Sequence, residues 1–550
     1  MNIEHGRGDR DGRGGWLARA GARLLAAALL ALSAAPAGAL AQAPSPAKAA
    51  VDANTAGAVA CESIQKQHFS AGPDAPILIS ASKVVAAAGP AHEYCDITGV
   101  IAPQIGFELR LPTKTWNGRY FQTGCGGFCG AINIQSCGDA QAEDFAVAAE
   151  NMGHVGDMLR DPVWGGVPEL RKDFGGRSAH LMAVASKAII ASYYGAAPAF
   201  SYFRGCSTGG REGLGEAQAF PADFDGIVAG DPAFAGRLGP IANNWDARQL
   251  IDRSGALVFP PEAIALLHNA VLAACDGLDG VKDGIITDPR SCVFDPAKLA
   301  CPKGKVAATC LSPEQVTSAR NIYAGVRNSQ GVRLFPGHLM LGSEAAWDGG
   351  YVNAFTDGAV RYIVFEKNPP AGYSHWDYDF DADVAKSEAT AALYDPVAPY
   401  TRPDLAAFSA RGGKLIVYHG WADQGVSPLA TLDYYAKVTA DGGGIDKVRD
   451  WFRVFMVPGM FHCRGGDAPN TFDMLSAAVA WVEHGKAPDQ VIATESKDGK
   501  VVRTRPLAPY PQVARYTGSG DVNDAANWTV AAPAKTYDDN IDWIWAPKAR

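Results

Sequence analysis

A short glycine-rich segment constrains the fold of this chain most strongly. Residues 205–209 read Gly-Cys-Ser-Thr-Gly and lie between a β-prone run, residues 200–204, and a helical run that continues to Phe220. A strand that turns sharply into a helix strains the backbone of its central residue, and close packing excludes side chains at the flanking positions. A glycine-rich surface turn is the alternative, but the flanking pattern favours a nucleophile elbow that exposes Ser207.

The same alternation of strands and helices extends over much of the chain. An early hairpin is predicted, and further β-prone runs occur before and after two helical segments. The hairpin is expected over residues 99–112, the strands over 119–123, 145–150, 200–204 and 226–229, and the helices over 180–194 and 208–220. This order is typical of a mostly parallel sheet that is covered by helices on both faces.

The alternation stops at about residue 232 and returns near residue 400. The intervening stretch holds four cysteines, an aspartate-rich loop and scattered Gly-Pro punctuation. The strand pattern then resumes at residues 414–418 and 451–457, before a closing helix at 474–484. We therefore predict a core formed by residues 42–233 and 399–550, with residues 234–398 as an inserted domain.

Residues 1–41 have the pattern of a cleaved secretory signal peptide. Five arginines between residues 7 and 23 precede an apolar run that begins at Leu24, and Ala39-Leu40-Ala41 offers a small-x-small cleavage pattern. The apolar run is shorter than the roughly 20 residues that a membrane-spanning helix needs. A buried core helix is the alternative, but no amphipathic partner lies nearby. The expected location is periplasmic or secreted, with no membrane partner.

Cysteine content supports this location, and the net charge indicates which partners to exclude. The chain of 550 residues has 11 cysteines, which is typical of an oxidising compartment. Its formal charge of −9 makes nucleic acid an unlikely partner, because nucleic-acid-binding proteins present basic faces.

A nucleophilic serine needs a histidine base, which an acid must orient. In this fold the acid and then the histidine follow the serine. Asp423 comes directly after the β-prone run 414–418, at the sheet edge where catalytic groups gather. A turn or helix-capping role is the alternative for Asp423. The competing acids lie in helical or turn contexts further from a strand end; they are Asp433, Asp441 and Asp446.

The histidine base is expected in a loop after the last strand of the sheet. His462 lies there, directly after residues 451–457, whereas His419 precedes the acid and His484 lies within a predicted helix. Cysteines are next to both candidates, since Cys206 precedes Ser207 and Cys463 follows His462. A bond between these two would hold nucleophile and base in register.

These motifs resemble the tannase and feruloyl esterase family of serine esterases, which also includes mono(2-hydroxyethyl) terephthalate hydrolases. The family signature is Cys-Ser, Asp and His-Cys, here Cys206-Ser207, Asp423 and His462-Cys463, and the resemblance extends from about Cys61 to the end of the chain. It implies an α/β-hydrolase fold with a lid domain inserted between the serine and the acid.

The resemblance also implies a structural calcium ion in the lid. Residues 275–288 read CDGLDGVKDGIITD, and carboxylates with backbone carbonyls suit a hard cation such as Ca²⁺. From the residues alone, an acidic turn-rich loop is an equal interpretation. By resemblance the ligands are the carboxylates of Asp276, Asp279 and Asp283 with the carbonyls of Val281 and Ile285.

Disulfides and an oxyanion hole follow from the same resemblance and fold. The implied bonds are Cys61–Cys95, Cys206–Cys463, Cys275–Cys292 and Cys301–Cys310, which leaves the pairing of Cys125, Cys129 and Cys137 open. An oxyanion hole in this fold uses the N–H after the nucleophile and one from an early loop. We therefore expect Thr208 to contribute, together with Gly126 or Gly127.

The expected activity is hydrolysis of phenolic acid esters, such as feruloyl, other hydroxycinnamoyl or galloyl esters, through an acyl-enzyme. The alternatives are a mono(2-hydroxyethyl) terephthalate hydrolase and a non-catalytic binding protein on the same fold. Five aromatic residues of the insertion either stack on a substrate ring or form the insertion's own core; these are Trp347, Tyr351, Phe355, Tyr373 and Trp376.

Overall fold

The computed structural model divides into two units, and all described residues belong to Ala47–Arg550. The predicted signal peptide, residues 1–41, lies outside the described residues. The described ranges are 54–234, 238–305, 308–335, 337–347, 349–394 and 403–540.

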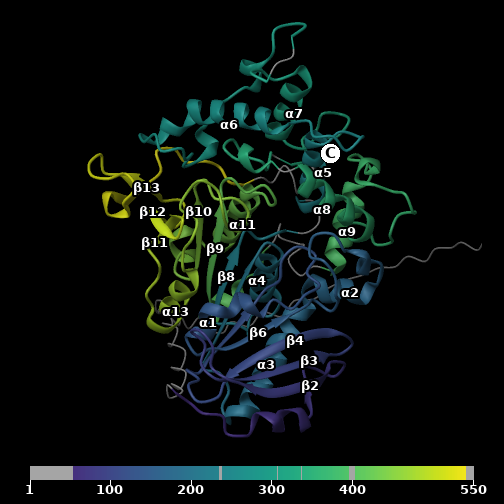
Figure 1. Cartoon of the computed structure of the whole chain (residues 1–550), viewed down its shortest axis with the longest axis vertical. Coiled ribbons are helices and arrows are strands. Elements are labelled where there is room, and N and C mark those ends of the chain that lie inside the picture. Colours follow the sequence, from purple (N-terminus) through teal and green to yellow (C-terminus); the bar gives the residue numbers. More distant parts are fainter. Residues whose placement is uncertain are drawn as a thin grey trace, which may run out of the picture. The chain divides into compact units, whose positions relative to one another are not determined.

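A ten-stranded mixed sheet forms the centre of the structure (Figure 1). In spatial order its strands are β1 (Phe69–Ser70), β2 (Pro76–Val85), β3 (Tyr94–Ile101), β4 (Ile105–Pro112), β6 (Ala146–Glu150), β5 (Arg119–Thr123), β7 (Phe200–Cys206), β8 (Gly226–Gly230), β9 (Lys414–Gly420) and β10 (Phe452–Val457). Strands β6, β5, β7, β8, β9 and β10 pair in parallel, whereas β1 to β4 and the β4–β6 pair are antiparallel. This is the α/β-hydrolase fold that the sequence predicted.

Burial differs between the two parts of the sheet. Strands β8 and β10 are buried at every position, whereas burial alternates along β3. Neighbouring residues of β8 show the reason, because Ile227 packs into one apolar cluster and Val228 into another on the opposite face. Parallel strands that are covered on both faces read as continuous apolar runs, which is why the sequence revealed them.

Helices cover both faces of the parallel strands. Residues of α3 (Ser178–Tyr194), α4 (Thr208–Ala219) and α11 (Pro428–Asp441) belong to the larger cluster, and α13 (Met474–His484) packs into the other. Four shorter helices connect these elements: α1 (Gly138–Ala142), α2 (Pro168–Lys172), α10 (Ala406–Ala410) and α12 (Ile445–Val448).

The segment between β8 and β9 is helical. Before α10 it contains α5 (Leu238–Leu250), α6 (Pro261–Cys275), α7 (Pro313–Ala324), α8 (Gly349–Tyr362) and α9 (Val384–Tyr394). It has a separate apolar cluster that includes Leu267, Ile322 and Trp347, while Phe335 and Val360 join the large cluster of the sheet. We call residues 234–398 the lid. Its status as a distinct domain stays a prediction.

Two small antiparallel sheets follow the last core helix. They pair β11 (Val491–Lys497) with β12 (Lys500–Leu507), and β13 (Val513–Tyr516) with β14 (Trp528–Ala531).

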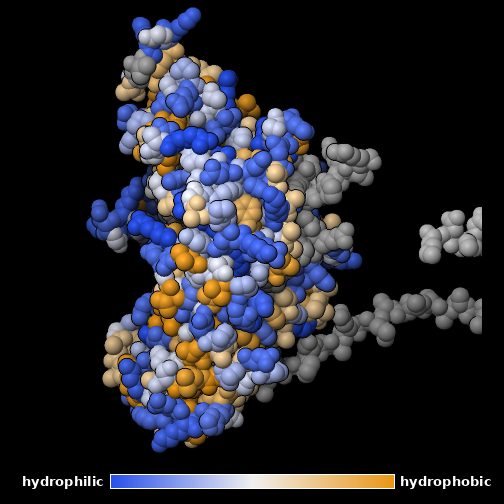
Figure 2. Space-filling view, turned by 90° about the vertical axis from the view of Figure 1, so that its right-hand side faces the viewer, coloured by the Kyte–Doolittle hydropathy of each residue, from blue (hydrophilic) through white to orange (hydrophobic). Residues whose placement is uncertain are grey.

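On the face in Figure 2, hydrophobic residues occur in small groups among hydrophilic ones. In the described part of the chain, the helices are too short or too polar to cross a membrane.

Candidate active site

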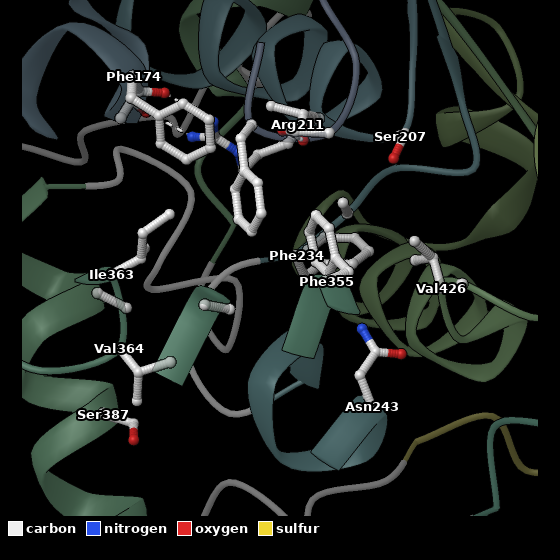
Figure 3. Close-up of a pocket in the computed structure, with 18 of the residues that line it drawn as sticks. Phe174, Ser207, Arg211, Phe234, Asn243, Phe355, Ile363, Val364, Ser387 and Val426 are labelled. Atoms are coloured by element: carbon white, nitrogen blue, oxygen red, sulfur yellow. Dashed lines mark hydrogen bonds between the residues drawn. The ribbon is translucent and has the colours of Figure 1, made fainter. Parts of the chain in front are cut away.

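Ser207 lies at the sharp turn between β7 and α4. Its φ of 63° and ψ of −121° are a strained conformation for a residue with a side chain. A Cβ at Gly205 would lie 2.4 Å from the carbonyl oxygen of Gly209, so the first glycine permits the approach of strand and helix. The geometry is that of a nucleophile elbow, and Ser207 lines a cavity (Figure 3).

The loop after β5 lies against the elbow. The Thr208 hydroxyl donates to the Gly127 carbonyl at 2.7 Å, and Cys125 N–H donates to a carboxylate oxygen of Glu212, in α4, at 2.9 Å. Gly127 has a φ of +55°, and a Cβ there would lie 2.2 Å from the Met158 carbonyl oxygen. This position therefore requires glycine.

The backbone amides of this loop differ in their partners. Those of Cys125, Phe128 and Cys129 donate to other groups of the protein. Among the described residues, the N–H groups of Gly126 and Gly127 have no acceptor. Of these two, Gly127 lines the cavity together with Ser207 and Thr208, which is compatible with a donor of an oxyanion hole.

Asp423 and His462 meet on loops that follow adjacent strands. His462 Nδ1 lies 2.8 Å from Asp423 Oδ2, and the other carboxylate oxygen accepts the backbone N–H groups of Gly425 and Val426 at 2.6 and 2.8 Å. Asp423 is fully buried, and the His462 side chain is 14% exposed. Ser207 and His462 line the same cavity. The structure thus brings together the three residues that the sequence indicated.

The electrostatics of this pair favour an imidazolium beside a carboxylate. Burial opposes protonation of His462, but the charge and hydrogen bond of Asp423 outweigh it and raise the His462 pKa to about 9. Burial likewise opposes ionisation of Asp423, but the imidazoles of His462 and His419 hold its pKa far below the usual value. Asp423 can therefore stabilise the charge that His462 gains as a general base.

The structure contains five disulfides. Four are the implied bonds, Cys61–Cys95, Cys206–Cys463, Cys275–Cys292 and Cys301–Cys310, and the fifth joins Cys125 to Cys129. Cys137 is a buried free thiol. The fifth bond closes the loop that presents Gly126 and Gly127, which is the pairing that the sequence left open.

The cavity at Ser207 has aromatic walls from both the core and the lid. Phe128 of the core stacks on Phe355 of the lid, with ring centroids 4.4 Å apart and planes at 8°. On the core side, the ring centroids of Trp164 and Phe174 lie 4.7 Å apart. In Figure 3, Ser207 and the lid residue Ser387 lie on opposite sides of the drawn residues.

Sequence reasoning placed only part of this wall. Phe355 lines the cavity, whereas Trp347 packs into the lid's own core with 7% exposure and Trp376 stacks against two arginines. The core contributions of Phe128, Trp164 and Phe174 were missed. Phe128 could have been predicted from the sequence, because it directly follows the glycine-rich loop that was expected to lie beside Ser207.

Comparison with known proteins identifies the chain's relatives. A family model described as "Tannase and feruloyl esterase" matches residues 83–531. The chain belongs to this family. It is similar to a mono(2-hydroxyethyl) terephthalate hydrolase of Piscinibacter sakaiensis, with 36% identity over 529 residues that cover 82% of this chain and 87% of the relative. A probable feruloyl esterase B-1 of Aspergillus oryzae is 32% identical over 79% of this chain and 82% of its own.

Solved structures agree with this membership. A feruloyl esterase B structure from Aspergillus oryzae matches with a TM-score of 0.74 and 28% identity, covering 86% of this chain and 99% of that one. A tannin acyl hydrolase from Aspergillus niger shares the fold, with a TM-score of 0.69 and 20% identity over 88% and 95% of the chains. The resemblance stated from the motifs is confirmed. This family member is a carboxylic ester hydrolase rather than a non-catalytic binding protein.

The lid loop predicted to hold calcium, residues 275–288, is rich in oxygen donors. Asp276 accepts backbone N–H groups of residues 283 and 284, Asp279 accepts the Thr287 hydroxyl, and Asp283 pairs with Arg505 at 2.8 Å. In the described chain, the side-chain clusters tight enough to hold a metal do not include this trio. The donor types suit Ca²⁺, but part of their charge is already matched by Arg505.

Proposed function

We propose that this esterase hydrolyses esters of phenolic aromatic acids, such as hydroxycinnamoyl or galloyl esters, with Ser207 as nucleophile. The stacked pair Phe128–Phe355 in the wall of the Ser207 cavity carries the proposal. Aromatic walls bind a flat ring through stacking and edge contacts. Ser387 and Thr390 also line the cavity on the lid side, but their hydroxyls donate to the backbone carbonyls of Asp383 and Lys386, so the aromatic wall is the main feature that selects the ring.

The two arginines that line the cavity use N–H donors on backbone carbonyls, so they offer a poor bidentate site for a substrate carboxylate. Arg211 donates through both terminal nitrogens to the backbone carbonyls of Phe174 and Gly175 at 2.7 and 2.8 Å. Arg171 donates to the carbonyls of Gly165, Tyr362 and Phe365. Bidentate binding of a substrate carboxylate needs parallel N–H donors that point at the ligand. A terephthalate monoester is therefore the second candidate, supported by the relative of that name.

The proposed reaction is acyl transfer in two steps. His462 removes the Ser207 hydroxyl proton while the serine oxygen attacks the ester carbonyl carbon. The carbonyl oxygen becomes an oxyanion that the amides of Thr208 and Gly126 or Gly127 stabilise. Asp423 holds the imidazole and stabilises its charge. The imidazolium then protonates the departing alcohol, and water attacks the acyl-enzyme by the same route.

The proposal is tested with the purified, oxidised protein on five esters: methyl gallate, methyl ferulate, methyl caffeate, mono(2-hydroxyethyl) terephthalate and p-nitrophenyl butyrate. We expect the highest kcat/KM on a gallate or hydroxycinnamate ester. A preference for the terephthalate monoester would favour the second candidate. Turnover of p-nitrophenyl butyrate alone would contradict an aromatic acyl pocket.

We further propose that the protein works outside the cytoplasm, in the periplasm or as a secreted enzyme. Five disulfides support this location, because such bonds persist in oxidising compartments. Fractionation of expressing cells, with a blot for the mature protein, tests it.

A further inference from the structure

A second buried carboxylate lies behind the candidate triad. Asp231 follows β8 directly, is fully buried and has a φ of 37°. Its backbone N–H donates to the Tyr418 carbonyl at 2.8 Å, and its Oδ1 accepts the Gly420 N–H at 2.9 Å. Its other oxygen lies 3.4 Å from the sulfur of Cys206, in the disulfide that joins the serine and histidine loops.

His419 lies between Asp231 and the triad acid. Its ring is fully buried, and Nδ1 lies 2.8 Å from the Thr431 hydroxyl. Nε2 lies 3.3 Å from Asp423 Oδ2, 3.6 Å from Asp231 Oδ1 and 3.2 Å from the Val426 carbonyl oxygen. All three neighbours of Nε2 are acceptors, so this nitrogen carries a hydrogen.

The cluster has one carboxylate more than the triad uses. Ligand atoms of Asp231, His419 and Asp423 all lie within 4.8 Å of one another. Two ionised carboxylates at this separation repel strongly when buried, unless a proton lies between them. Burial, opposed by His419 and reinforced by Asp423, raises the Asp231 pKa to about 7. His462 and Tyr418 are the other titratable groups that face Asp231.

We propose that Asp231 and His419 are positioning residues behind Asp423, with the Nε2–H of His419 shared between the two carboxylates. This N–H donor stabilises the Asp423 carboxylate and moderates its attraction for the His462 proton. The His419 N–H also fixes the carboxylate oxygen that accepts from His462.

This inference rests on the proposed roles of Ser207, Asp423 and His462, and its test separates the two. We would measure kcat and KM for p-nitrophenyl butyrate from pH 5 to 10, together with the rate of Ser207 labelling by a fluorophosphonate. A wild-type protein that neither turns over nor labels contradicts the serine-esterase mechanism itself. An active wild type makes the variants below informative, whatever the acyl preference.

His419→Gln removes the imidazole from between the two carboxylates. Asp423 then loses the imidazole N–H donor and attracts the His462 proton more strongly, so the His462 pKa rises further. We call the rise of kcat/KM with pH, as His462 loses its proton, the acid limb. We expect this acid limb to move up by about one pH unit, which lowers kcat/KM about tenfold at pH 7, with KM little changed. In Asp231→Asn/His419→Gln the extra carboxylate is gone, so the limb should return toward its wild-type position.

Two results would overturn the inference. One is an unmoved acid limb in His419→Gln, even if kcat falls, since that indicates only a structural role. The other is a shift that persists in the double variant. The matched control is His268→Gln, because His268 also pairs with a buried carboxylate, Glu344 at 3.0 Å, but lies in the lid away from the cavity.

A variant that keeps the imidazole covers the case in which His419→Gln does not fold. Thr431→Val removes only the hydroxyl at Nδ1, at a side chain of similar shape that is 2% exposed. We expect the acid limb to move in the same direction by a smaller amount. An unmoved limb in a folded Thr431→Val protein would contradict the proposal.

Discussion

The two sides of the substrate cavity are built in different ways. On the core side, backbone geometry places the reactive groups: a strained serine, two glycines that admit no side chain, and carboxylates buried among N–H donors. On the lid side, helices α8 and α9 contribute side chains such as Phe355 and Ser387. The core side therefore tolerates little change, while the lid side can vary one side chain at a time.

This difference separates chemistry from selection. Transition-state stabilisation depends on donors fixed within tenths of an ångström, which covalent and backbone constraints provide. Choice between acyl groups depends on apolar contacts, which are each worth only a few kcal/mol at most. Core variants should thus change kcat for every ester, and lid variants should change the ranking of esters.

Removal of the nucleophile should have the largest effect. Ser207→Ala is expected to lower kcat on all esters by a factor on the order of 10⁴ or more, because no other group replaces the attacking oxygen. The melting temperature should change little, since the alanine Cβ occupies the same place at the elbow. Turnover near the wild-type rate in this variant, measured after removal of contaminating esterases, would sink the assignment of Ser207.

The pH dependence should reflect the core and not the lid. With its pKa raised to about 9, His462 is a free base in a fraction that grows about tenfold per pH unit below that value. We expect kcat/KM to rise about fiftyfold between pH 7 and pH 9 for every ester of the panel, because half of His462 is still protonated at its pKa. Asp423→Asn removes the carboxylate that most strongly attracts the His462 proton. In this variant kcat/KM should therefore rise at lower pH than in the wild type, and its maximum should be much lower.

The same shift has a consequence for stability. A group whose pKa is raised on folding stabilises the folded state fully below its unfolded value, near 6.5, and that contribution disappears as the pH rises through about 9. Thermal unfolding of the wild type between pH 6 and 9.5 checks this, with Asp423→Asn as the control that should show a weaker slope. An equal slope in both would count against the Asp423–His462 pair as its source.

Disulfides allow a matched comparison of the two sides. The core bond Cys206–Cys463 spans 257 residues and holds the serine and histidine loops together, whereas the lid bond Cys301–Cys310 spans nine. Loop entropy predicts destabilisation of about 5 kcal/mol and about 3 kcal/mol for the respective Cys→Ala pairs. We expect an about tenfold or greater loss of kcat only for the core pair, since a misplaced base slows the reaction. Equal kinetics of the two double variants would contradict this.

The sequence predicted the core side of the substrate cavity well and the lid side poorly. Strand–turn–helix chemistry and chain order placed Ser207, Asp423 and His462, because local backbone rules govern those positions. The cavity's stacked pair could not be predicted, since Phe128 and Phe355 are 227 residues apart and meet only through packing of lid on core. Chain order excluded His419 as the base, since it precedes the acid, but its burial beside two carboxylates is a tertiary feature that the sequence does not show.

Loss of the Phe355 ring should change the preference between aromatic and non-aromatic esters. Phe355→Ala removes an aromatic partner of Phe128, and such pairs contribute about 0.5 to 1.5 kcal/mol beyond area burial. We expect kcat/KM on the best aromatic ester to fall about fivefold, mostly through KM, with little change on p-nitrophenyl butyrate. Phe355→Leu keeps most of the volume and distinguishes loss of stacking from collapse of the cavity. A uniform loss on all esters would place Phe355 in the chemistry instead.

Calcium should have the smallest effect on turnover, because its proposed site in the lid loop contributes no atom to the reaction. Chelation of the proposed ion removes a divalent charge from among Asp276, Asp279 and Asp283, so their mutual repulsion should increase and the lid should melt earlier. We expect EDTA to lower the melting temperature by several degrees, Ca²⁺ but not Mg²⁺ to restore it, and kcat to stay constant below the transition. Asp279→Asn should abolish the response. Dialysed protein without bound calcium, and with a melting temperature indifferent to both EDTA and Ca²⁺, would contradict a structural calcium in this loop.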